Sequence, residues 1–289
     1  MNIPDPPADH TDIRAVGEFV TAVYRGLFDD ADAGFTAKAF GWMADAFQGH
    51  QPGYSGIDCG YHDIEHTMQV TICLAQLLAG YDAASAQPAL DRRVFELAIL
   101  AALFHDSGYL KRREDTAGTG AKYTPVHVAR SGDFVAMLML RDGYTPDDIE
   151  AVRNMIDCTA HGEPPGKVPF RNELDRTVGY GVGTADLLAQ MAAPNYLEKL
   201  PLLYAEFDEA RQHADDRLPA SLTFEGADDL VRRTPAFWQD FVLPRLQNEF
   251  LSVYRFLSPD GSDRSNPYFR HVLENMTRIR ERVAATKHV

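Results

Sequence analysis

One segment of the chain constrains the fold more than any other, because it is apolar on almost every side. The segment LDRRVFELAILAALFHD covers residues 90–106, and its apolar stretch runs from Val94 to Phe104. A helix that is hydrophobic all round lies in the interior of a protein rather than on its surface. We therefore predict a buried central helix.

The neighbouring segments also carry helical signals. YTPVHVARSGDFVAMLML offers Thr124 as N-cap and Pro125 as first helical residue, and YTPDDIEAVRNMIDCTAHG offers Thr145 and Pro146 in the same roles. Alternating apolar and polar runs are few, and no Asn-Gly hairpin joins β-branched segments. The sequence therefore predicts an all-α protein.

The charge balance limits the partners of the chain. Its 289 residues include 42 acidic and 28 basic ones, for a formal net charge of −14. Such a surface repels polyanions, so we expect neither nucleic acid nor an acidic membrane as a main partner, although a metal site can still attract a small anion. No run of about 18 apolar residues is present, so no membrane span is predicted.

Cysteine usage and the first residues indicate the compartment. Cys59, Cys73 and Cys158 are odd in number and form no CxxC pattern, which favours a reducing compartment. The first ten residues, MNIPDPPADH, lack the basic start and the apolar run of a signal peptide. These features predict a cytoplasmic protein.

We expect three parts along the chain. Residues 1–55 should form a disordered start and one or two helices, residues 56–200 a core that holds the histidine-rich motifs, and residues 201–289 a helical appendage packed on that core. The appendage carries a stripe of aromatic and apolar residues near helical spacing, interrupted by Pro244: Phe237, Phe241, Phe250, Tyr254 and Leu257. Such a stripe is more often a packing surface than a ligand contact, but it could form one wall of a pocket.

The stretch GYHDIEHTMQV (60–70) places His62 and His66 one helical turn apart, so both side chains should leave the same side of a helix. That side continues into a buried stripe, and Ile64 and Met68 belong to a second apolar face. Two buried histidines without partners would cost much free energy. We therefore expect His62 and His66 to serve a function rather than to lie on a solvated face.

A second polar pair ends the central helix. His105 and Asp106 follow Phe104, and Ser107-Gly108 breaks the helix. A divalent metal would satisfy both side chains, since imidazole nitrogen and carboxylate oxygen suit Zn, Mn, Fe, Co or Ni. The structural alternative is a helix end in which the imidazole interacts with the dipole and the carboxylate caps a turn. The pair alone leaves both interpretations open.

Together these residues resemble the HD superfamily of metal-dependent phosphohydrolases, in which ligands on separate helices of an all-α core bind one or two divalent metals. The matching order is His66, then His105-Asp106, then Asp186 in GTADLLAQM. The resemblance implies an HD-domain helical bundle with additional N- and C-terminal helices, in which residues 56–200 are the metal-binding catalytic core. These four residues would be metal ligands.

The stretch GYHDIEHTMQV is also similar to the YHNxxHxxxV signature of cyclic-nucleotide phosphodiesterases, with Asp63 in place of the Asn. In those enzymes the first histidine protonates the leaving oxygen and the second binds metal. The resemblance therefore implies that His62 is the general acid and that His66 is the ligand.

Some HD enzymes place two more histidines between the HD pair and the final Asp. His127 in TPVHVARSG and His161 in DCTAHGEPP occupy such positions. The resemblance then implies two divalent ions per chain, bridged by Asp106, with the metal open among Mn, Fe, Ni, Zn, Co and Mg. The matched pattern extends over residues 62–186.

The implied chemistry is hydrolysis of a small anionic phosphorylated substrate, with a nucleotide or another phosphodiester as first choice. Two divalent ions about 4 Å apart can hold a phosphoryl group and lower the pKa of a bridging water toward 7. Asp63 or Glu65 would hold an imidazole in its tautomer. Lys111, Arg112 and Arg113 would either meet the substrate's charge or form a solvated basic patch.

Two other functions stay open. Some HD-fold proteins with the same six ligands hold a mixed-valence diiron centre and oxygenate their substrates, but an oxygenase needs no general acid at His62. Non-catalytic HD modules bind a nucleotide and signal by conformation, but they often lose the HD pair. The base-reading glutamine of phosphodiesterases has four candidates, and the oligomeric state is open between a monomer and a homodimer. The candidates are Gln190, Gln212, Gln239 and Gln247.

Overall fold

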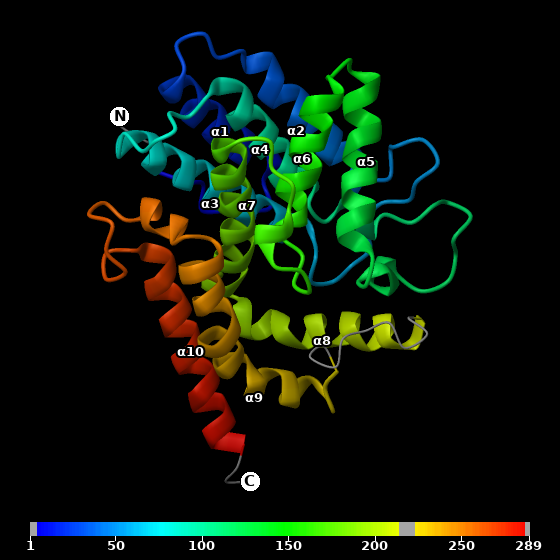
Figure 1. The fold of residues 1–289 in the computed structure, drawn as a ribbon. Helices are drawn as coiled ribbons and strands as arrows, with labels where there is room; N and C mark the ends of the chain where they lie inside the picture. Colours follow the sequence, from blue (N-terminus) through cyan, green and yellow to red (C-terminus); the bar gives the residue numbers. More distant parts are fainter. Residues whose placement is uncertain (1–4, 214–222, 287–289) are drawn as a thin grey trace.

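The computed structural model describes residues 5–213 and 223–286, and these ranges form an all-helical bundle (Figure 1), which confirms the predicted fold class. A single isolated bridge, between Tyr54 and Arg112, is the only β pairing within them. The α-helices are α1 (Ile13–Leu27), α2 (Ala33–Phe47), α3 (Ile64–Ala83), α4 (Arg92–Phe104), α5 (His127–Arg141), α6 (Pro146–Asp157), α7 (Glu173–Ala192), α8 (Tyr196–His213), α9 (Ala227–Phe237) and α10 (Pro267–Thr286). Shorter 3-10 and π turns connect them: η1 (Ser107–Tyr109), η2 (Gly120–Tyr123), η3 (Pro165–Lys167), η5 (Trp238–Val242), η6 (Arg245–Glu249) and η7 (Val253–Leu257). The disordered start predicted for the N-terminus includes residues 1–4, which lie outside the described ranges.

Helix α4 is the buried central helix that the sequence predicts. Every residue from Phe95 to Phe104 is buried, and α4 contacts α2, α3, α5, α6 and α7. Asp91 caps its first turn by accepting hydrogen bonds from the backbone N–H groups of Arg93 and Val94. Because the helix ends at Phe104, His105 and Asp106 emerge inside the bundle and not at its surface.

The two predicted N-caps differ in outcome. Thr145 forms the capping box with Asp148, and Pro146 begins α6, so that prediction is confirmed. The prediction for Thr124 is wrong, because α5 begins at His127. The Thr124 hydroxyl donates to the carbonyl of Ala121 in the preceding turn η2, so it does not cap the next helix.

Helix α7 packs closely against its neighbours through a glycine-rich stretch. A Cβ on Gly183 would lie 2.6 Å from the carbonyl oxygen of Cys158 and 2.6 Å from Cζ of Phe250. The missing side chain therefore lets α7 approach the end of α6 and the C-terminal segment. This approach fixes the position of Asp186, which lies less than one turn further along α7.

Residues after α7 form a second group of helices, which Figure 1 shows below the main bundle, with α8 crossing beneath it and α10 running down to the C-terminus. Helix α10 contacts α7 and α9, and α8 contacts η2 and α9. In the aromatic stripe, Phe250 and Tyr254 are fully buried and Leu257 is nearly so, which fits packing, whereas Phe237 is 37% exposed. The stripe therefore has a packing part and an exposed part.

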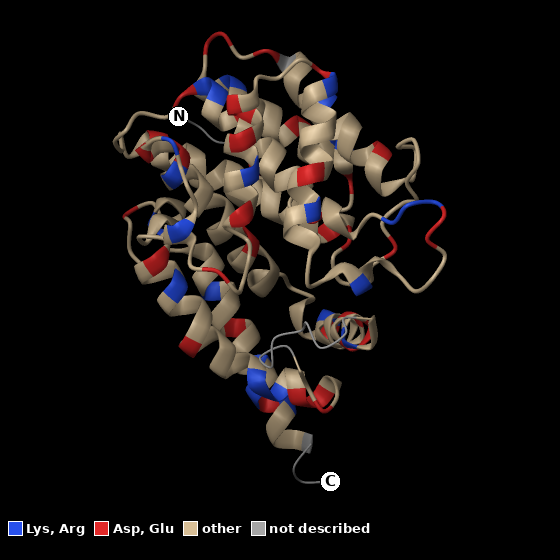
Figure 2. Ribbon diagram, turned by 45° about the vertical axis from the view of Figure 1, so that its right-hand side comes forward, with Lys and Arg blue, Asp and Glu red and all other residues tan. Residues whose placement is uncertain are grey.

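Figure 2 shows acidic and basic residues interspersed along the helices and loops. Among the helices of the described ranges, none combines the length and the apolar character that crossing a membrane requires.

We expect Gly183→Ala and Gly41→Ala to change stability in opposite directions, although both glycines are helical. The added methyl at Gly183 meets a backbone oxygen and a buried ring, so it should cost about 1–3 kcal/mol of unfolding free energy. Gly41 in α2 has open space around its Cβ position, so alanine there should add about 0.5–1 kcal/mol. Urea unfolding of both variants measures the difference, and a stabilising Gly183→Ala would contradict the close packing.

Candidate metal centre

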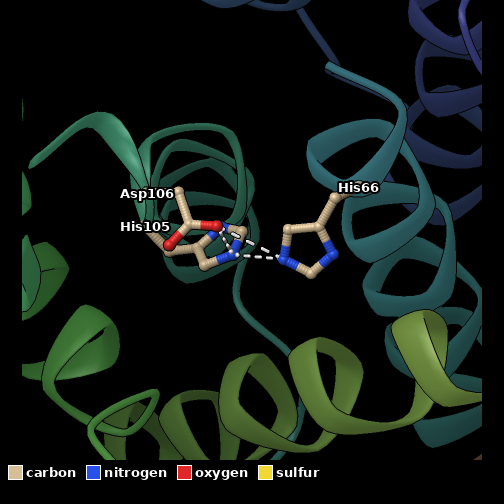
Figure 3. Close-up of side chains that lie close together, drawn as sticks. All are labelled: His66, His105 and Asp106. Atoms are coloured by element: carbon tan, nitrogen blue, oxygen red, sulfur yellow. Dashed lines mark hydrogen bonds and ion pairs between the residues drawn. The ribbon is translucent and has the colours of Figure 1, made fainter. Parts of the chain in front are cut away.

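Three helices bring four side chains to one buried point. His66 lies in the first turn of α3, His105 and Asp106 follow the end of α4, and Asp186 lies within α7. All four residues are buried, with exposures between 1% and 6%. Figure 3 shows the imidazole of His66 directed toward His105 and Asp106 from the opposite helix.

The ligand atoms of these residues lie close together. His66 Nε2 is 3.2 Å from His105 Nε2, 3.3 Å from Asp106 Oδ2 and 3.3 Å from Asp186 Oδ1. His105 Nε2 is 3.1 Å from Asp106 Oδ2 and 3.6 Å from Asp186 Oδ1. Ligand atoms about 2.1 Å from one ion stand about 3.0–3.4 Å apart in octahedral or tetrahedral geometry. The spacing therefore fits a single divalent cation.

Hydrogen bonding fixes the tautomer of His105 in the form that a metal requires. Its Nδ1 donates to the carbonyl of Ala102 at 2.8 Å, so Nε2 turns an unprotonated nitrogen toward His66 when the ring is neutral. Two ring nitrogens that face each other at 3.2 Å repel unless a proton or a cation lies between them. In addition, Asp106 Oδ2 and His66 Nδ1 are buried without a hydrogen-bond partner. The unsatisfied Asp106 oxygen faces the Nε2 atoms of His66 and His105, and this donor set fits a divalent metal.

His127 approaches the same carboxylate from its other side. Its Nε2 lies 3.7 Å from Asp106 Oδ1, whereas His66 and His105 face Oδ2. Its Nδ1 donates to the carbonyl of Thr124 at 2.7 Å, which again leaves Nε2 as the donor atom toward the centre. The two oxygens of Asp106 thus face different histidines, as a carboxylate that bridges two metal ions would.

Close backbone packing holds His127 in this place. A Cβ on Gly108 would lie 1.9 Å from the carbonyl oxygen of His127, so only glycine lets η1 pass this near to the start of α5. The Gly108 N–H donates to Ser131 Oγ at 2.8 Å, and its carbonyl accepts from Arg130 Nε at 2.7 Å. The turn that follows Asp106 is therefore fastened directly to the helix that carries His127.

His161 lies apart from this cluster. It follows α6 in an exposed bend, and its ring is nearly parallel to the rings of Phe241 and Phe237, at centroid distances of 5.8 and 6.3 Å. In the described part of the chain, no ion pair joins His161 to Asp106 or Asp186. Desolvation by the surrounding protein lowers the pKa of His161 to about 4, and the charge of Asp186 opposes this shift. The structure therefore brings His161 to the border of the centre and not into its ligand cluster.

His62 precedes the helix that carries His66. Asp63 caps α3 by accepting from the His66 N–H at 3.0 Å, so the predicted helical face shared by His62 and His66 is wrong. The two rings nevertheless lie near each other, with centroids 5.8 Å apart. The His62 ring also stacks on Tyr109 at 4.6 Å, and Tyr109 stacks on His127 at 4.7 Å.

A carboxylate that the sequence analysis did not single out holds His62. Glu206 on α8 lies 2.5 Å from His62 Nδ1 through Oε2, and its Oε1 accepts from the Tyr61 N–H at 2.6 Å. Burial alone would lower the pKa of His62, but the charges of Glu206 and Asp106 raise it to about 9. His62 is therefore protonated at neutral pH in the metal-free protein.

The acids proposed for this role have other partners. Lys199 Nζ donates to Asp63 Oδ2 at 2.8 Å and to Glu65 Oε2 at 3.1 Å, and Asn195 Nδ2 donates to Glu65 as well. The role expected for Asp63 or Glu65 therefore falls to Glu206. No local pattern could have indicated Glu206, because it lies 144 residues from His62 in the chain.

The basic run after the HD pair is used structurally. Lys111 donates to the Gly118 carbonyl at 2.6 Å and pairs with Asp58 at 2.8 Å. Arg112 lies over the ring of Tyr54, and Arg113 donates to backbone carbonyls. Lys111 is thus buried in structural contacts, whereas Arg112 and Arg113 are exposed, as the solvated alternative predicted.

Among the four candidate glutamines, Gln190 lies beside the centre. Its Nε2 donates to the Asp186 carbonyl at 3.0 Å and approaches Oδ1 at 3.3 Å, while its Oε1 accepts from Tyr61 at 2.8 Å. Gln190 thus links Asp186 to the segment that carries His62.

A protein-family model described as Npun_R2479-like matches residues 113–274, which is more than half of the chain. The matched range includes His127, His161, Asp186 and Glu206 and begins after His105-Asp106. No curated protein matches the chain.

We expect Glu206→Gln to lower the pKa of His62 strongly, because the variant keeps the burial and removes the main charge that raises this pKa. In wild type the folded-state pKa near 9 exceeds the ordinary value of about 6.5. The protonated ring therefore stabilises the fold below about pH 6.5, and this stabilisation is lost as the pH rises toward 9. NMR titration of the His62 ring in the metal-free protein measures the shift. An unchanged pKa in the variant would contradict the role of Glu206.

We also expect Mn²⁺ or Ni²⁺ to stabilise the wild-type protein and to displace protons. Burial opposes a charge on His105, but Asp106 and Asp186 raise its pKa well above the ordinary value, so a bound metal must replace a proton. At a metal concentration 100 times the Kd, the melting temperature should rise by about 4–5 °C.

The matched variants are His105→Ala and His50→Ala. The first should lose this rise, and the second, an exposed histidine outside the centre, should retain it. Calorimetry in buffers of different ionisation enthalpy measures the released protons. An equal rise in both variants would place the metal elsewhere.

Proposed function

The chain belongs to the Npun_R2479-like family, and we propose that it is a metal-dependent phosphohydrolase of the HD type with a preference for phosphodiesters. The observation that carries this proposal is the arrangement around Asp106. One of its oxygens lies 3.1 and 3.3 Å from the two facing imidazole nitrogens of His105 and His66, and the other lies 3.7 Å from His127.

The residues that would hold the metals follow from this arrangement. His66, His105, Asp106 and Asp186 would hold the first ion, and Asp106 and His127 would contribute to a second. His161, at the border, would reach that second ion only after its bend moves inward. Bound divalent ions supply Lewis acidity toward a phosphoryl oxygen and toward water.

His62 supplies the proton that a departing alkoxide needs. Glu206 occupies Nδ1, so the acidic proton that is free to move lies on Nε2. The stacked ring of Tyr109 and the carboxylate of Glu206 restrict the rotation of the imidazole, so the proton is held in a fixed direction. A positioned general acid of this kind contributes about 10²–10⁴ in rate.

This acid favours hydrolysis over the diiron oxygenase alternative. Cleavage of a phosphate ester releases an alkoxide that must be protonated, whereas oxygenation of a C–H bond releases no such group. A buried imidazolium beside the cluster has a clear use only in the first reaction. The complete buried ligand set likewise favours an enzyme over a module that only binds and signals.

The test is hydrolysis of bis-(p-nitrophenyl) phosphate and p-nitrophenyl phosphate with added Mn²⁺ or Ni²⁺. We expect wild type and His50→Ala to cleave the diester, and Asp106→Asn to lose activity together with metal. Because p-nitrophenolate leaves without a proton, His62→Asn should keep its metal and most of its activity toward this diester. Toward a cyclic nucleotide, whose leaving group is an alkoxide, His62→Asn should lose about 10²–10⁴ in kcat.

Other outcomes would change the assignment. Preference for the monoester would redirect the proposal to nucleotidases. Bound iron with a diiron spectroscopic signal and no cleavage would support the oxygenase, and full activity in Asp106→Asn would exclude a metal-dependent reaction at this centre.

A further inference from the structure

Gln190 connects the buried cluster to the segment before α3. It lies on α7, four residues after Asp186, so the two side chains leave the same side of the helix. Its Nε2 donates to the Asp186 carbonyl at 3.0 Å and to Asp186 Oδ1 at 3.3 Å. Oδ1 also faces the Nε2 atoms of His66 and His105, at 3.3 and 3.6 Å. The Gln190 amide therefore contacts the same oxygen that would bind the first ion.

Tyr61 fixes the orientation of this amide. The Tyr61 side chain is buried, and its hydroxyl donates to Gln190 Oε1 at 2.8 Å. The opposite orientation of the amide would turn Oε1 toward two acceptors on Asp186, the carbonyl and Oδ1, which would repel it. The two neighbours of Gln190 therefore select one orientation, in which the NH₂ group faces Asp186.

These contacts leave Gln190 no donor for a substrate. Its NH₂ group has two hydrogens, and Asp186 offers one acceptor for each of them. An amide that reads a base needs a free donor beside a free acceptor. Gln190 is one of the four glutamines that the sequence leaves open for that role, and its contacts fit a residue that positions Asp186 instead.

Tyr61 also lies beside the proposed acid. Its backbone N–H donates to Glu206 Oε1 at 2.6 Å, and Glu206 Oε2 lies 2.5 Å from His62 Nδ1. The hydroxyl of Tyr61 thus leads through Gln190 to the ligand Asp186, and its backbone leads through Glu206 to the acid. The ligand and the acid are held relative to each other through this one residue.

We propose that Gln190 and Tyr61 are positioning residues of the metal centre. Gln190 holds the Asp186 carboxylate with Oδ1 toward the first ion, and Tyr61 holds the Gln190 amide. This inference rests on the proposed function for the role of Asp186 as a ligand, and it adds the residues that orient this ligand. Hydrogen bonds from surrounding residues fix the direction of a ligating carboxylate, and loss of such a partner weakens metal binding about 10–100-fold.

The test is the Kd of Mn²⁺, measured by calorimetric titration of the metal-free protein. Gln190→Leu keeps a side chain of similar size and should weaken binding of the first Mn²⁺ about 10–100-fold. Tyr61→Phe keeps the ring and removes the hydroxyl, so it should weaken binding by up to about tenfold, as the loss of one hydrogen bond does.

Gln212→Leu is the matched control. Gln212 Nε2 donates to Asp208 Oδ2 at 2.8 Å, so it forms the same pair of glutamine and aspartate four residues apart on a helix, but at an exposed place on α8. This variant should bind Mn²⁺ as wild type does. An equal loss of affinity in Gln212→Leu and Gln190→Leu would overturn the inference.

The double variant separates positioning from a general structural effect. If Tyr61 acts through Gln190, its hydroxyl has no effect once the amide is gone. Tyr61→Phe combined with Gln190→Leu should therefore bind Mn²⁺ as weakly as Gln190→Leu alone, whereas independent losses would multiply and overturn the inference. Should Gln190→Leu fail to fold, Tyr61→Phe decides alone, and wild-type affinity in that variant would contradict the positioning role.

Ester hydrolysis distinguishes this inference from the proposed function. Diester cleavage by wild type, together with unchanged Mn²⁺ affinity in Gln190→Leu, would keep the proposed function and remove the positioning role. Weakened Mn²⁺ binding in both single variants of a protein that cleaves no ester would support the positioning role and remove the proposed function. No Mn²⁺ binding by wild type would overturn both.

Discussion

The contact between two imidazole nitrogens and two carboxylates, where α3, α4 and α7 meet, is the interaction on which the remaining structure depends. Burying such groups costs free energy unless each is compensated. Without a metal, bound protons compensate the carboxylates. Burial opposes the charges, but Asp106 and Asp186 raise the pKa of His105. His105 and His62 in turn lower the pKa of Asp106. A divalent cation at this site would therefore have to displace protons. The packing around the site, down to the missing side chain of Gly183, keeps these helices at their close spacing.

The residues after position 200 contribute to this centre more than an appendage would. Glu206 of α8 sets the charge of His62, and Arg245 fixes the bend of His161. Helix α8 also holds the loop before η2, because Glu209 accepts hydrogen bonds from the N–H and the hydroxyl of Thr119. The residues that hold His62 and the bend of His161 thus come from a part of the chain that is far in sequence from His66, His105 and Asp106. A variant truncated near residue 200 would lose Glu206, the partner of the proposed acid, and Phe250, which packs against Gly183 of α7.

Features that depend on neighbouring residues could be predicted from the sequence. Predictions failed where a contact with a residue elsewhere in the chain determines the structure. Helix α4 and the Thr145 capping box follow from apolar patterning and from a few adjacent residues, and both are present. Thr124 is followed by proline, as Thr145 is, but its hydroxyl donates to the carbonyl of Ala121 in the preceding turn and does not cap a helix. The sequence could indicate His66, His105, Asp106 and Asp186 because their order resembles the HD motif, although their contacts join distant parts of the chain. Glu206 belongs to no such pattern, because it lies 144 residues from His62 in the chain.

The one departure from the phosphodiesterase signature, Asp63 for Asn, changes little in this environment. Either side chain can cap a helix, and Asp63 accepts the His66 N–H as an asparagine oxygen would. The additional negative charge is met by Lys199 at 2.8 Å, so it is directed away from the histidines. Because Asp63 is committed to the cap and to Lys199, the carboxylate that controls His62 has to come from another helix. Asp63 and the His62–Glu206 pair are therefore parts of one arrangement, in which the cap orients His66 and α8 orients His62.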